Sequence, residues 1–131
     1  MLAYRGVAAS FEDAFCTNQG NNTAPTLCAL GTNFNGDQYV GFYSTENTNL
    51  VLPGDLTARV LNQYVNGSHF GVAAADKSLG SSGAVPADVG SMNSGGWATI
   101  AIAIKSLNPP PEIVPPGGQT ATKHQHRKKK K

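Results

Sequence analysis

Charged side chains are scarce in this sequence. They make up 14% of its 131 residues, whereas soluble globular domains carry about 25%. Gly, Asn, Ser and Thr take their place. Helix surfaces depend on Glu, Lys, Gln and Arg, so this exchange argues against a helical protein and favours strands joined by turns. The same composition is typical of extracellular and virion proteins.

Long apolar runs are also missing. The longest, residues 97–104, has the length of a strand and not the roughly 20 residues of a membrane span. No extended apolar region follows Met1, so the sequence shows no signal peptide. We predict no membrane span and an extracellular, cell-surface or virion location. A virion component released by lysis needs no signal.

Cysteine is limited to Cys16 and Cys28. The polar segment between them reads as a flexible loop. Two alternatives remain open from the sequence, namely two free thiols or a disulfide formed in an oxidising compartment. A zinc site is excluded, because no second cysteine pair or matching histidine completes four ligands.

Basic residues are unevenly distributed along the chain. Six of the ten stand in the last nine positions, and residues 1–122 are mildly acidic. We therefore divide the chain into a module over residues 1–107, a Pro/Gly-rich linker over 108–118 and a disordered basic tail over 119–131. The tail is predicted to bind polyanions without sequence specificity, through Lys123, Arg127, Lys128, Lys129, Lys130 and Lys131.

Short strands separated by glycine-rich turns are expected throughout the module. Residues 56–65 fit both a helical spacing and a strand alternation, and Asn66-Gly67, a two-residue hairpin signal, favours the strand. Loops are predicted over 10–25, 47–54 and 78–96, with a turn over 31–37. The predicted strands are 1–7, 25–30, 39–44, 56–65, 68–75 and 97–105.

Two of these strands have distinct faces. In 39–44, Val40 and Phe42 point one way while Tyr39 and Tyr43 point the other. In 97–105 three isoleucines form one face, and the small residues of the other suit a neighbouring layer, which indicates a central strand. The pattern predicts an all-β fold, an antiparallel β-sandwich or jelly roll.

The ordered motifs AYRGV (3–7), YVGFYST (39–45), LPGDLTAR (52–59), AAADKSLGSSG (73–83) and GGWATIAIAIKS (95–106) resemble a β-sandwich module of large bacterial surface proteins and phage structural proteins. The resemblance implies a sandwich with no established catalytic activity. Members of that family usually carry further strands before the AYRGV segment. The chain therefore resembles the C-terminal part of the module, and a sandwich lacking its first strands would have unpaired edges and a half-covered core. We expect oligomerisation or poor solubility.

Enzymatic chemistry finds little support in the residues. His69 is the only histidine outside the tail and is expected on the surface beside a turn, without the orienting partner that a general base needs. Glu12 and Asp13 lack a second acid pair across a cleft. A calcium site using Asp37 and backbone carbonyls is a minor alternative, since an EF-hand spacing is absent. We predict no enzyme, no cofactor and no metal.

Aromatic residues supply the one candidate ligand site. Tyr39, Tyr43, Tyr64 and Trp97 could form a carbohydrate platform if exposed, although aromatics in small sandwiches are mostly core. The sequence thus favours a structural or display module of a virion or bacterial surface, with other copies or chains of that assembly as partners. A carbohydrate-binding module with a glycan partner is the alternative.

Overall fold

Strands are the only regular elements in the computed structural model, which describes residues 7–66 and 69–106. This confirms the all-β prediction. Within these residues no helix has the length and apolar character needed to cross a membrane. The strands are β1 (Val7–Asn22), β2 (Thr26–Leu27), β3 (Leu30–Thr32), β4 (Gln38–Thr45), β5 (Thr57–Tyr64), β6 (Phe70–Ser78), β7 (Gly83–Val85), β8 (Asp88–Val89) and β9 (Gly95–Ser106).

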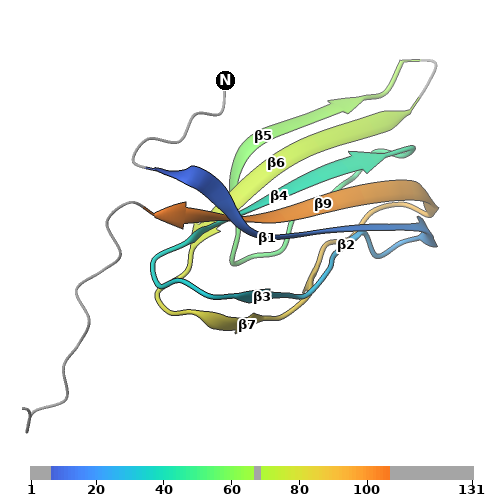
Figure 1. Ribbon diagram of the computed structural model, residues 1–131. Coiled ribbons are helices and arrows are strands. Elements are labelled where there is room, and N and C mark those ends of the chain that lie inside the picture. The colour runs from blue at the N-terminus through green and yellow to red at the C-terminus, as the bar shows by residue number, and fades with distance from the viewer. Residues whose placement is uncertain (1–6, 67–68, 107–131) are drawn as a thin grey trace, which may run out of the picture.

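One large antiparallel sheet organises the molecule, with the strand order β1-β9-β4-β6-β5. Two two-stranded sheets, β2–β8 and β3–β7, form a smaller second layer beside it (Figure 1). The packing is therefore sandwich-like. We call the face of the large sheet that meets the second layer the inner face, and its opposite the outer face. β9 lies between β1 and β4, as expected of a central strand.

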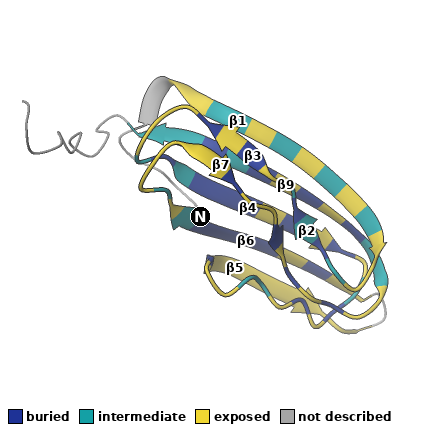
Figure 2. Cartoon of the chain, turned by 90° about the horizontal axis from the view of Figure 1, so that it is seen from below, coloured by how far each residue is buried: buried dark blue, intermediate teal, exposed yellow. Residues whose placement is uncertain are grey.

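The core lies between the inner face and the second layer, where the buried residues of β4, β6 and β9 gather (Figure 2). Tyr39 and Tyr43 alternate along β4 with Gly41 on this face. Gly41 is required for space, because a Cβ there would overlap the side chain of Leu27 from the second layer. An alanine lies beside each tyrosine on one neighbouring strand and beside Gly41 on both, so large and small side chains interlock. The core comprises Leu27, Leu30, Tyr39, Tyr43, Leu50, Leu56, Ala73, Ala75, Val85, Ala101 and Ala103.

Polar links and one disulfide join the two layers. Cys16 of β1 and Cys28 of the second layer are bonded, with their Cα atoms 6.2 Å apart. This selects the disulfide from the two alternatives left open by the sequence. The backbone carbonyl of Thr26 accepts hydrogen bonds from Asn18 Nδ2 at 3.2 Å and from the Thr99 hydroxyl at 2.7 Å. The second layer is thus tied to β1 and β9.

The predicted loop over residues 10–25 is wrong. Most of it belongs to β1, the longest strand, which pairs with β9 from Val7↔Ser106 to Asn22↔Gly95. Its Asn, Gly and acidic residues have weak strand propensity. Pairing with an apolar central strand outweighs that local preference, because propensity in sheets depends on the neighbours.

One other local prediction also needs correction. The loop over 78–96 contains β7 and β8, which pair with β3 and β2. The predicted turn at Asn66-Gly67 includes Gly67, which lies outside the described residues, and the strands on either side of it pair from Tyr64 and Phe70 onward. The predicted strand over 56–65 is confirmed as β5. The predictions for residues 1–6, for the linker over 108–118 and for the tail over 119–131 concern residues outside the described part of the chain.

Candidate functional site

Much of the outer face is apolar and exposed, and none of the described strands forms a second layer over it, although Val40 and Asp76 of this face are buried. Its residues are identified by register, since Phe42 pairs with Ile100 and Ala74, and Ala74 pairs with Val60. All five strands contribute large hydrophobic side chains to it. Seven of them, which we call the apolar patch, keep 36% to 60% of their surface exposed, namely Phe15, Phe42, Val60, Tyr64, Phe70, Val72 and Ile100.

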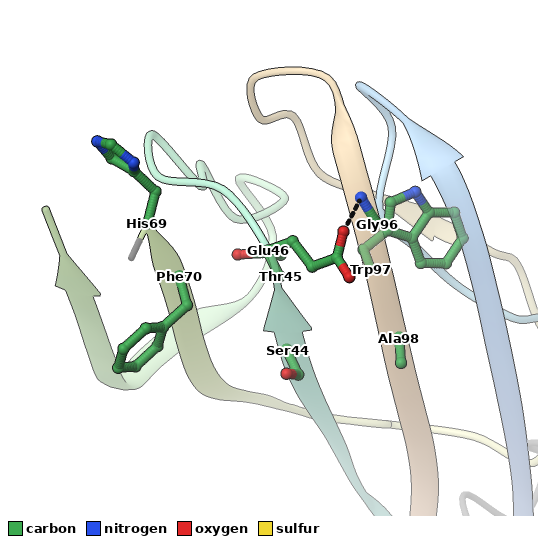
Figure 3. A pocket seen from close by; sticks show the side chains of 8 residues that line it. All are labelled: Ser44, Thr45, Glu46, His69, Phe70, Gly96, Trp97 and Ala98. Atoms are coloured by element: carbon green, nitrogen blue, oxygen red, sulfur yellow. Dashed lines mark hydrogen bonds between the residues drawn. The ribbon is translucent and has the colours of Figure 1, made fainter. Parts of the chain in front are cut away.

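A depression interrupts the patch at the end of the sheet nearest Phe70. Its floor consists of the small exposed residues Ser44 and Ala98, which are Cα partners on β4 and β9. It has a volume of about 430 Å³ and is also lined by Thr45, Glu46, His69, Phe70, Gly96 and Trp97 (Figure 3). A second depression of about 140 Å³ continues it toward Phe42 and Ile100. We call the two together the trough.

Polar groups stand at the rim of the trough. The Glu46 carboxylate accepts a hydrogen bond from the backbone N–H of Gly96 at 3.2 Å (Figure 3). His69 and Phe70 lie on the opposite side of the trough. The Phe70 ring stacks on Tyr64, with ring centres 5.4 Å apart. Among the described residues no hydrogen bond orients His69, so the rim is not arranged as a general base with a partner.

An ion pair closes the β5 side of the outer face. Arg59 Nε donates to both carboxylate oxygens of Asp76, at 2.9 and 3.0 Å. Asp76 is buried, and Arg59 covers it from the exposed edge. The register shift between Ala58 and Val60 allows Arg59 to reach this carboxylate. The two opposite charges are thus paired at this edge of the outer face.

On the inner side, Lys77 bridges two carboxylates. Its ammonium group lies 2.6 Å from Asp55 and 2.7 Å from Asp88, and 5.1 Å from the centre of the Tyr39 ring. Burial alone would lower the pKa of Lys77, but the bonds to both carboxylates outweigh it and the pKa is raised. The bond to Lys77 likewise lowers the pKa of Asp55. This cluster fastens β6 to the second layer and is structural.

Asp37 and Asp13 form a second acidic pair near the start of β4. Asp37 is fully buried, and burial followed by the neighbouring Asp13 raises the pKa of Asp37 to about 6. Burial raises the pKa of Asp13, but the hydrogen bonds from Asn33 outweigh burial and bring this pKa below 3.8. Asp37 is therefore the first of the two to take up a proton as the pH falls. In the described part of the chain no three His, Cys, Asp or Glu side chains gather as metal ligands.

Three of the four aromatic residues proposed as a sugar platform are buried. Tyr39 has no exposed surface, and Tyr43 and Trp97 are almost fully covered. Burial also raises the pKa of both tyrosines. The Trp97 ring lies against Gly20, and its N–H donates to Asn22 Oδ1 at 2.9 Å. A platform made from these side chains is therefore wrong, because they fill the space between the layers.

Of the proposed aromatics only Tyr64 is exposed, and the other exposed aromatics of the outer face are different residues. Phe42 and Phe70 lie in segments that the sequence predicted as strands, whereas Phe15 lies in a segment predicted as a loop. The stacking of Tyr64 on Phe70 depends on the register of the β5–β6 hairpin. Strict alternation of apolar residues on both faces of 97–105 was the one sequence signal for a second apolar surface. The small residues of the other face of this strand suited a neighbouring layer, and Ala101 and Ala103 of that face do lie in the core.

No protein-family model, curated protein or solved structure matches the chain. Its class therefore follows from the geometry alone. The chain is an all-β module in which one antiparallel sheet is packed on its inner face and carries an exposed apolar patch on its outer face.

Proposed function

We propose that this chain is a non-enzymatic structural module of a bacterial surface or virion assembly, which packs its outer face against a β layer of another chain. The observation that carries the proposal is the apolar patch, to which all five strands of the sheet contribute. Monomeric proteins rarely expose contiguous apolar surface of more than a few hundred Å². Five strands about 4.8 Å apart and eight residues long give the whole outer face an area of about 600 Å², and the apolar patch is the exposed apolar part of it.

The disulfide supports a location outside the cytoplasm. Bonds of this kind persist in oxidising surroundings and are rare in reducing ones. The low charge content of the chain and its resemblance to surface and phage modules agree with the same location. Together they favour a surface or particle component over an intracellular enzyme.

Fractionation of the producing cells and of any particles they release tests this function. We expect the native chain in the envelope or particle fraction and the Ile100→Glu variant in the soluble fraction, because a carboxylate on the outer face opposes burial. Val51→Glu is the matched control, since Val51 is exposed outside the large sheet and should leave the distribution unchanged. A native chain found only in the soluble fraction would contradict the proposal.

Glycan binding is the second candidate, and the stacked Tyr64–Phe70 pair beside the polar rim of the trough favours it. Sugar rings stack on exposed aromatic faces while hydroxyls bond to polar side chains. On a glycan array, binding of a defined sugar that is lost in Tyr64→Ala and kept in Phe15→Ala would support this candidate. An array without signal would remove it.

A further inference from the structure

The outer face has relief that runs across the strands. Phe42 and Ile100 are Cα partners and form a ridge of two large side chains. Ser44 and Ala98 are the partners in the next row of the same face and form the floor of the trough. Successive rows on one face are about 7 Å apart. A ridge and a trough of similar width therefore lie side by side.

Such relief is complementary to itself. Consider a two-fold axis that lies in the plane of the interface, runs across the strands and passes between the two rows. Rotation about this axis places the ridge of one copy over the trough of the other. The ridge of each copy then enters the trough of the other. Packed sheets lie about 10 Å apart because side chains of the two faces interdigitate in this way. Contact between two ridges would hold the sheets farther apart.

We propose that the outer face is the contact surface of a symmetric dimer of this chain, in which the Phe42–Ile100 ridge of each copy fills the Ser44–Ala98 trough of the other. This inference rests on the proposed function and names the partner as a second copy. A two-fold interface requires a patch that is complementary to itself, and this patch meets that requirement.

The size of the face agrees with a dimer. The whole outer face has an area of about 600 Å² in each copy, so a dimer through it buries at most about 1,200 Å² in total, at the lower end of the range for specific interfaces. An interface of that size is consistent with a dissociation constant of about 1 to 100 µM. The dimer is therefore expected to dissociate on dilution.

Charge favours a second copy as well. The ridge and the trough floor are uncharged, and on the β5 side Arg59 is paired with Asp76. Glu46 is held at the end of the trough by its bond to Gly96. Two copies of a face with an uncharged middle meet without the repulsion that like charges produce. A strongly charged partner would find no complement there.

Sedimentation velocity of the full chain over a range of concentrations tests the dimer. We expect a reversible monomer–dimer equilibrium. Ala98→Phe fills the trough and should weaken the dimer at least about tenfold, although it adds apolar surface to the outer face. Ala84→Phe adds the same ring to an exposed position of β7 in the second layer and should leave the equilibrium unchanged. Phe42→Glu should give a monomer, and circular dichroism checks that each variant is folded.

Three results would overturn the dimer. The first is a native chain that stays monomeric at concentrations far above about 100 µM. The second is stronger association in both Ala98→Phe and Ala84→Phe, which would indicate non-specific adhesion. The third is an unchanged equilibrium in folded Ala98→Phe.

Fractionation of the cells and particles distinguishes a failure of the dimer from a failure of the proposed function. A monomer that still needs Ile100 for its envelope or particle location refutes the dimer alone, whereas a dimer found only in the soluble fraction refutes the function alone.

Discussion

The two faces of the large sheet are built from the same strands and differ in what covers them. On the inner face, Tyr39 and Tyr43 alternate with Gly41 beneath Leu27, and a disulfide and two hydrogen bonds hold the second layer in place. On the outer face, Phe42 and Ile100 are about two-fifths exposed. Apolar pattern alone does not decide which surface of a strand becomes core. The position of a second layer does.

The largest expected contrast is between Leu27→Ala and Ile100→Ala, which remove the same number of carbon atoms. Leu27 is fully buried, so its truncation leaves a cavity and should lower the free energy of unfolding by about 2–5 kcal/mol. Ile100→Ala should cost about 1 kcal/mol, because the side chain is partly solvated already. Urea unfolding at a concentration where the chain is monomeric measures both. Equal losses would mean that the outer face is packed in the monomer too.

Reduction of the disulfide tests how firmly the second layer is attached. The loop that Cys16 and Cys28 close is short, and its loss is expected to cost about 3 kcal/mol. Chemical unfolding of the Cys16→Ser/Cys28→Ser variant, beside the native chain, gives the difference. Its outer face should keep the same dimer affinity if the native register is retained. An unchanged unfolding midpoint would show that the hydrogen bonds through Thr26 suffice.

Gly41→Ala probes the fit between the layers. The added methyl group overlaps Leu27, and overpacking of this kind typically costs about 1–3 kcal/mol. Gly31→Ala is the control, because Gly31 lies in β3 with open space where its Cβ would stand. Thermal melts of the two variants provide the comparison. A loss in Gly31→Ala as large as in Gly41→Ala would refute the close contact with Leu27.

Asp37 gives the smallest expected effect, and it depends on pH. Its pKa is about 6 in the folded chain, above the value of 3.8 in the unfolded chain, so the folded state holds the proton more tightly. The contribution of Asp37 to stability is therefore greatest below pH 4 and falls as the pH rises to 6. Asp37→Asn should remove this fall and add about 1–2 kcal/mol at pH 7, discounted for coupling to Asp13.

Unfolding of this variant at pH 4 and pH 7 measures the difference. Glu12→Gln changes an exposed carboxylate of β1 and should alter stability by no more than about 0.5 kcal/mol at either pH. An Asp37→Asn variant that is less stable than the native chain at pH 7 would contradict the raised pKa of Asp37.

Strand alternation explains the parts of the fold that the sequence predicted. The faces of Tyr39/Tyr43 and Val40/Phe42 follow from a period of two, and β4, β5, β6 and β9 lie close to their predicted positions. The failures are β1, β7 and β8, whose residues have weak strand propensity and become strands by pairing. Pairing partners distant in sequence leave no local signal.

The candidate site shows the same division. Alternation identified the isoleucine face of β9 as apolar, and the aromatic residues were recognised as sugar-binding or core. Only the structure showed that Tyr39, Tyr43 and Trp97 are buried while Phe15, Phe42, Phe70 and Tyr64 are exposed. Burial depends on the second layer, which is built from short segments with no clear pattern.

The sequence by itself determined an all-β chain with few charges, two faces to each main strand and a basic tail, because these follow from composition and from the period of the side chains. The tertiary structure alone decided that Cys16 meets Cys28, that β1 pairs with β9, and that the second layer covers the tyrosine face. These outcomes depend on contacts between distant residues. The apolar patch is the consequence, since the second layer covers one face of the sheet and leaves the patch on the other face exposed.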